Sequence, residues 1–101
     1  MTFLLELRII MSGTITTVIY FKIESKFEEW VKTFDTLEAE RRHAEFGINP
    51  FFRDHSNDDP QKVICIYHSW EGNIQKFVQA NIEWIKIHKV AFSTMKESSW
   101  I

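Results

Sequence analysis

The chain of 101 residues has little of several features on which particular protein classes depend. Cys65 is the only cysteine, so no disulfide can form within the chain. Its position in an apolar stretch predicts a buried thiol, and a cytoplasmic, reducing setting is expected. The three glycines are isolated and form no phosphate-binding loop. No run approaches the ~18–20 apolar residues that span a bilayer, so no membrane segment is predicted.

An excess of charge of one sign is also lacking, since 12 lysines and arginines stand against 14 aspartates and glutamates. The formal net charge is −2 and the pI is near 6.1, which argues against a general nucleic-acid binder. The one basic cluster, Arg41–His43, is flanked by Glu38, Glu40 and Glu45 and predicts a solvated helix face. The four histidines show no metal-ligand spacing, so neither a metal nor a cofactor is expected.

What the chain does have is apolar and aromatic residues, at 45% and 15%, enough for the core of one domain. Residues 14–101 are predicted to form that domain. Residues 1–13 are either an extra edge strand or an upstream extension. Phe3–Ile10 alternates weakly, as a strand does, while Met11 followed by Ser12 resembles a natural start.

Two predicted strands are apolar on both faces, Thr14–Ile23 and Gln61–Trp70. In the second strand, one face carries Val63, Cys65 and Tyr67, and the other carries Ile64, Ile66 and Trp70. A strand of this kind lies in the middle of a sheet and needs cover on both faces.

The first helix is predicted to begin at a capping box made by Ser25 and Glu28. An apolar stripe at helical spacing follows, consisting of Phe27, Trp30, Val31, Phe34 and Leu37. The polar segment Glu38–Glu45 is expected to project into solvent, and Gly47 to stop the helix.

The segment Phe51–His55 has a proline before it and charges within it, which predicts an edge strand. A second helix is expected to start at a cap on Asn73. It carries two apolar stripes, which indicate either burial on two sides or a break near Asn81. The tail Phe92–Ile101 is expected to form a last edge strand.

The predicted order of elements is strand, helix, strand, strand, helix and strand. This order predicts an α+β fold of the ferredoxin-like split βαβ type. This topology puts the two doubly apolar strands in the centre and the others at the edges. Both helices then cover one face of the sheet, and the other face implies a homodimer.

At this point the chain resembles the dimeric α/β-barrel superfamily of antibiotic-biosynthesis-monooxygenase-like proteins, including its small uncharacterised cyanobacterial families. The residues that carry the resemblance are the Asp59-Pro60 turn, the apolar strand Val63–Tyr67, and Trp70-Glu71-Gly72 before the helix. They are short motifs within a resemblance that covers residues 14–92.

The resemblance implies a pocket between sheet and helices for a small hydrophobic or aromatic molecule. Tyr20 and His68 are the candidate catalytic residues. The candidate ligand-binding residues are Lys22, Trp70, Trp84 and His88. The structural alternatives are that Trp70 is a core aromatic, that His68 is a hydrogen-bonded structural histidine, and that His88 is a partly exposed helix residue.

A haem-degrading branch of the same superfamily is a further alternative. There a helix-borne His binds iron and a Trp contacts the macrocycle, roles that would fall to His88 and Trp70. That branch also uses an Asn on the first strand, and Phe21–Ile23 contains none. Haem degradation is therefore disfavoured.

Two functions remain in competition. One is a non-catalytic ligand-binding or stress-responsive module, and the other is a cofactor-independent monooxygenase-like enzyme. They differ in whether the pocket between sheet and helices is open. The aromatic residues that could fill it are Trp30, Phe34, Trp70, Phe77 and Trp84.

Overall fold

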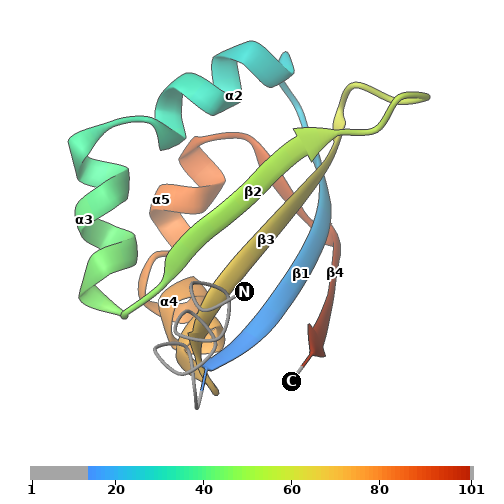
Figure 1. Cartoon of the computed structure of the whole chain (residues 1–101). Coiled ribbons are helices and arrows are strands. Elements are labelled where there is room, and N and C mark those ends of the chain that lie inside the picture. Colours follow the sequence, from blue (N-terminus) through green and yellow to red (C-terminus); the bar gives the residue numbers. More distant parts are fainter. Residues whose placement is uncertain (1–13, 101) are drawn as a thin grey trace, which may run out of the picture.

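A computed structural model describes residues 14–100, which form one antiparallel four-stranded sheet with helices on one side (Figure 1). The elements in chain order are β1 (Thr14–Ile23), α2 (Phe27–Phe34), α3 (Leu37–Glu45), β2 (Asn49–His55), β3 (Lys62–Trp70), α4 (Asn73–Ala80), α5 (Ile82–Ile87) and β4 (Val90–Trp100). The strand order is β2-β3-β1-β4. This confirms the predicted α+β, ferredoxin-like fold. The prediction for residues 1–13 lies outside the described part.

The two central strands pair over their whole length, from Thr14 opposite Trp70 to Lys22 opposite Lys62. Side chains alternate, so odd-numbered residues of β1 and β3 face the helices and even-numbered residues face the other way. We call this second surface the open face. Among the described residues, no helix covers it (Figure 1).

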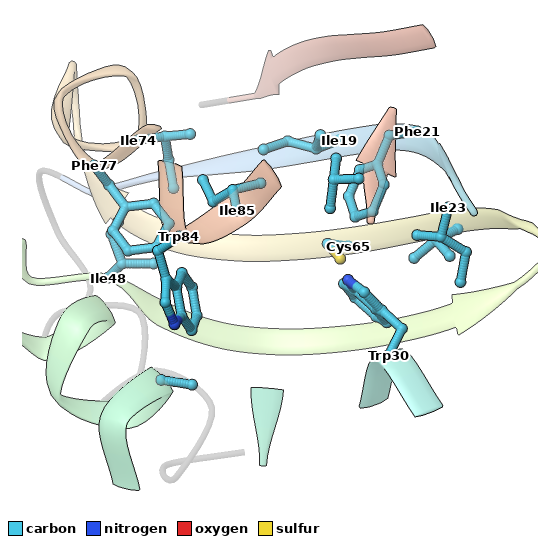
Figure 2. Packing of buried hydrophobic residues seen from close by; sticks show 13 residues of the cluster. Ile19, Phe21, Ile23, Trp30, Ile48, Cys65, Ile74, Phe77, Trp84 and Ile85 are labelled. Carbon is cyan, nitrogen blue, oxygen red and sulfur yellow. The ribbon is translucent and has the colours of Figure 1, made fainter. Parts of the chain in front are cut away.

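The core lies between the sheet and the helices (Figure 2). Its strand residues include Ile19, Phe21, Ile23, Val63 and Cys65, and its helix residues include Trp30, Ile74, Phe77, Trp84 and Ile85. Each of these side chains is at most 8% exposed. The thiol of Cys65 is buried and free, as predicted.

The first helical segment is two helices rather than one. The chain breaks at Asp35, and the Thr36 hydroxyl caps α3 by accepting a hydrogen bond from the Ala39 N–H at 3.1 Å. Leu37 therefore leaves the apolar stripe and is 71% exposed. The predicted capping box was wrong, because α2 starts after Lys26 without a side-chain cap.

The segment expected to project into solvent packs in part against the core, since Ala39 and His43 are buried. Gly47 does end α3. Its φ of 64° is left-handed, a conformation that glycine adopts without strain.

The second helical segment also consists of two helices, so of the two alternatives the break near Asn81 is the one that the structure has. Asn81 is buried; its side chain donates to the Phe77 carbonyl at 2.9 Å and accepts from Arg42 at 2.6 Å. Asn73 is not the cap. Its side chain instead donates to the Phe46 carbonyl at 2.8 Å, which links the end of α3 to the start of α4.

The two edge strands lie where they were expected, β2 beside β3 and β4 beside β1. The β1–β4 pairing shifts register between Tyr20 and Lys22, where β4 bulges out. In residues 14–100, no helix has the length and hydropathy needed to cross a membrane.

Candidate functional site

A cavity of about 600 Å³ opens between α2, α3 and the β2–β3 side of the sheet. Its aromatic lining residues are Trp30, Phe34 and Tyr67, with Phe51 and Phe52 at the β2 edge, which borders both the cavity and the open face. Its charged or titratable lining residues are Asp35, Glu40, His43, Arg53 and Cys65. The volume lies within the range of small-molecule sites, roughly 300–1,000 Å³. The aromatic side chains therefore do not fill this space.

A second, small apolar cavity of about 30 Å³ adjoins the first and shares several of its walls. The shared residues are Trp30, Phe34, His43, Ile48 and Tyr67. These side chains separate the open cavity from the deep core, so a shift in any one of them changes the space available to a ligand.

The floor of the cavity comes from β3, where alternation directs Cys65 and Tyr67 toward the helices. Burial raises the pKa of Cys65 to about 11, against smaller opposing effects of the Tyr67 hydroxyl and Arg53. Burial also raises the pKa of Tyr67 well above its usual value. Both groups are therefore neutral near pH 7 and act as hydrogen-bonding groups rather than as anions.

His43 is the most informative polar residue of the cavity wall. Its Nδ1 lies 2.6 Å from the Ala39 carbonyl, an acceptor, so Nδ1 carries the proton. The ring lies between Phe77, at 4.6 Å, and Tyr67, at 5.9 Å, stacked on both. Burial lowers the pKa of His43 more than the bond to Ala39 raises it. The neutral imidazole thus offers Nε2 as an acceptor.

Nε2 of His43 is buried and has no hydrogen-bond partner among residues 14–100. The same is true of Nε1 of Trp30, a side chain that is only 2% exposed. In Figure 2 the Trp30 indole nitrogen is turned toward the thiol of Cys65. A buried polar group without a partner costs about 1–3 kcal/mol. One such donor and one such acceptor therefore belong to residues of the same cavity wall.

The mouth of the cavity carries an ion pair between Arg53 of β2 and Asp35, which lies between α2 and α3. The pair ties the edge strand to the two helices above it. Both side chains are partly exposed, at 28% and 55%, so their attraction is screened by water. Glu40 adds a further carboxylate near the entrance.

Four of the residues predicted to form the site do not line this cavity. Tyr20, Lys22, His68 and Trp70 are even-numbered strand residues and lie on the open face. Trp70 is 55% exposed, so it is not a core aromatic of this chain. The ring of His68 stacks on Phe51 at 4.8 Å.

The two helix residues of the predicted site do lie together. Trp84 is buried in the core, and the His88 ring is 5.1 Å from it. Burial lowers the pKa of the half-buried His88. Trp84 also supports the Arg42 guanidinium, 4.9 Å from its ring. Neither Trp84 nor His88 lines the open cavity.

These positions do not fit a haem group. Trp70 belongs to the open face, whereas His88 ends α5 on the helix side of the sheet, so the two cannot hold one macrocycle within this chain. In the described range, no three His, Cys, Asp or Glu side chains cluster as metal ligands.

The sequence did contain a signal for His43 that the prediction missed. Ala39 and His43 are four residues apart and are followed by Phe46, a narrow stripe on an otherwise charged helix. The glutamates and arginines around it obscured that stripe. Trp30 was predicted as one of the aromatic residues that could fill the pocket between sheet and helices, whereas it forms part of the wall of an open cavity.

The fold is that of solved antibiotic-biosynthesis-monooxygenase-like proteins, as the resemblance in the sequence implied. Three solved structures share the fold. A variant of SnoaB, a cofactor-independent oxygenase from Streptomyces nogalater, matches with a TM-score of 0.58 and 12% identity over 89% of this chain and 93% of that one. A putative antibiotic biosynthesis monooxygenase from Nitrosomonas europaea matches with a TM-score of 0.57 and 14% identity. The match covers 87% of this chain and 88% of that one. An uncharacterised NIPSNAP-like domain protein from Burkholderia xenovorans matches with a TM-score of 0.54 and 10% identity. The match covers 88% of this chain and 84% of that one.

At these identities the likeness shows the fold alone. The chain belongs to the family described as Domain of unknown function (DUF3764), whose family model matches residues 14–101. No curated protein matches the sequence.

Proposed function

We propose that this protein binds a small, partly aromatic molecule in the cavity beneath α2 and α3. The observation that carries the proposal is the open volume of about 600 Å³ in a place that aromatic side chains could have filled. Trp30, Phe34 and Tyr67 supply flat apolar walls, and a few polar groups can fix the orientation of a ligand.

The polar groups of the cavity wall define which hydrogen-bonding groups such a ligand must carry. His43 Nε2 accepts a hydrogen bond, and Trp30 Nε1 donates one. A ligand that approaches both, after a small movement of the wall, needs a hydroxyl or N–H donor and a carbonyl-type acceptor. Each bond would relieve a buried group that has no partner, which favours binding.

A blocked cavity tests the proposal. Ala44 is an exposed residue of α3 that lines the cavity, so Ala44→Trp should fill the entrance without disturbing the core. Ala80→Trp, at the exposed end of α4, is the matched control. Hydroxylated aromatic ketones should raise the melting temperature of the wild type and of the control but not that of Ala44→Trp. Equal shifts in all three proteins would contradict binding in this cavity.

A second candidate is cofactor-independent oxygenation, the activity named for SnoaB. The specific observation in its favour is the neutral His43, because Nε2 can take the proton of a bound phenol. The electron-rich phenolate would then react with O₂ to give a quinone: one oxygen atom becomes a new ring carbonyl, and the other leaves as water with the ring hydrogen and the phenolic hydrogen. No metal enters this balance.

Oxygen consumption separates the two candidates. His43→Asn keeps a donor near the Ala39 carbonyl and removes the base, so it should abolish O₂ uptake with a dihydroxynaphthalene. His68→Gln, on the open face, should leave uptake unchanged. A wild type that binds the compound but consumes no oxygen would leave the first candidate, binding without catalysis.

We also propose that two copies of the chain pack through their open faces. The face is rich in apolar side chains, namely Val18, Tyr20, Phe52, Ile64, Ile66, Trp70 and Trp100. Several are large and exposed, and a patch of this kind marks an interaction surface. A second copy is the simplest partner, because a sheet face pairs with its own equivalent through a two-fold axis.

Sedimentation velocity tests the dimer. Ile66→Glu places a charge in the middle of the open face, and Ile87→Glu places the same charge at an exposed site on α5. The wild type and Ile87→Glu should sediment as dimers at micromolar concentration, and Ile66→Glu as a monomer. A monomeric wild type would contradict the proposal.

The free thiol of Cys65 is consistent with the cytoplasmic setting expected from the sequence, which remains part of the proposal.

A further inference from the structure

One end of the open face differs chemically from the rest of it. Lys22 lies directly opposite Lys62 on β3, and Lys96 of β4 lies opposite Tyr20. These four side chains, with Phe21 and Thr94, line a hollow of about 340 Å³, which we call the lysine hollow. Three strands thus bring three ammonium groups to one concave place.

The hollow is built by the bulge in β4. Between Tyr20 and Lys22 the pairing skips from Lys96 to Ala91, so several β4 residues stand opposite one residue of β1. The Lys22 N–H, displaced from the regular ladder, donates to the Thr94 hydroxyl at 2.8 Å. That hydroxyl in turn donates to the Ala91 carbonyl at 2.6 Å. Bulges held by such bonds are structural features that recur next to binding sites.

The charges of the hollow are only partly balanced. Like charges directly opposite one another on a sheet are destabilising, and Lys22 faces Lys62 in this way. Asp59 lies 3.4 Å from the Lys22 ammonium and offsets one charge. Within the described chain, neither Lys62 nor Lys96 forms an ion pair. A local excess of positive charge therefore stands on a chain whose net charge is −2.

We propose that the lysine hollow binds a compact multivalent oxyanion, specifically a phosphate or diphosphate group. Lysine ammonium groups act on phosphate as compact point charges, and the Tyr20 hydroxyl can add a neutral donor. A bound anion would also remove the repulsion between Lys22 and Lys62. The site is independent of the cavity beneath α2 and α3, because it lies on the opposite face of the sheet.

The hollow is also compatible with a dimer. It lies at the Lys22 end of the central pair of strands, eight residues from the Trp70 end. At 3.3 Å per residue, these ends are about 26 Å apart. The apolar residues nearer the Trp70 end, such as Ile66 and Trp70, can therefore meet a second copy while the lysine hollow, with Tyr20, stays at the margin.

Pyrophosphate and inorganic phosphate are the probes, with NaCl used to hold the ionic strength constant. Isothermal titration of the full chain should show saturable binding of pyrophosphate. The double variant Lys62→Gln/Lys96→Gln should weaken binding by about tenfold or more, as expected for lost charge-assisted hydrogen bonds. The control Lys76→Gln/Lys86→Gln makes the same change of charge on α4 and α5 and should keep wild-type affinity.

Circular dichroism would establish that both double variants are folded, as expected for exposed lysines. No saturable binding by the wild type would overturn the proposal. An equal loss of affinity in the control variant would also overturn it, because the effect would then follow net charge alone. Citrate that binds the same lysines more tightly than pyrophosphate would overturn the assignment to a phosphate group.

Discussion

Two tryptophans test the separation between the core and the open face. The sequence makes both Trp30 and Trp70 plausible fillers of the same interior, whereas the structure leaves them 2% and 55% exposed. Truncating each to alanine should therefore have very different effects on the free energy of unfolding.

For Trp30 the expected loss is large. Its ring contacts Phe21 at 5.5 Å, Phe27 at 5.9 Å and Phe34 at 4.5 Å between centroids. Removing a buried aromatic side chain costs about 3–5 kcal/mol. We expect Trp30→Ala near the lower end, because one side of the ring already borders a cavity. Trp30→Phe should cost about 1 kcal/mol or less, since it also removes an indole N–H that has no partner.

For Trp70 the expected loss is small. Full burial of a large apolar side chain contributes roughly 1.5–3 kcal/mol, and less than half of this side chain is buried. Trp70→Ala should cost about 1 kcal/mol or less in a dilute, monomeric sample. At high concentration it should cost more, if the open faces pair.

Urea unfolding followed by circular dichroism at two protein concentrations measures all three variants. Trp30→Phe is the control at that position. It keeps an aromatic ring in the core and removes the indole N–H, so it separates the loss of packing from the loss of a polar group. The reasoning would be refuted by a Trp70→Ala variant that loses 3 kcal/mol or more when dilute, or by a Trp30→Ala variant that loses almost nothing.

Two further predictions concern titration and thiol access. Burial lowers the pKa of His43 below 6.5, so its contribution to stability is complete above pH 6.5 and falls as the pH drops toward the folded-state pKa. Urea unfolding from pH 8 to 5 should show the free energy of unfolding falling by at most about 1.4 kcal/mol per pH unit. His43→Asn should remove more of this pH dependence than His88→Gln. Cys65, with a pKa of about 11 and 1% exposure, should react with a thiol reagent only as fast as the protein opens. Rapid labelling of native protein would contradict its burial.

The strand order of the sheet could be predicted because the sequences of central and edge strands differ clearly. β1 and β3 are apolar on both faces and lie in the centre, whereas Pro50 and Arg53 mark β2 as an edge. The boundaries of the helices were harder to predict. The apolar stripe from Phe27 continues to Leu37, so it hides the break at Thr36, whose cap on Ala39 is a local hydrogen bond.

The site could not be predicted from the strands for a physical reason. When both faces of a strand are apolar, alternation shows which residues share a face but not which face the helices cover. Tyr20, His68 and Trp70 were grouped correctly with one another, but that group lies on the open face. The cavity wall instead uses Cys65 and Tyr67, together with a histidine that charged neighbours obscured.

The pairing of β4 with β1 has a consequence for the order of folding. The bond from Lys22 to Thr94 closes a loop of 72 residues, whereas β2 and β3 pair from His55 to Val63, across eight residues. By the logarithmic dependence on length, the longer closure costs about 2 kcal/mol more conformational entropy. We expect the β2–β3 hairpin to form early and β4 to dock late. The C-terminal strand would then also be the first to open, and its amide hydrogens should exchange soonest among the four strands.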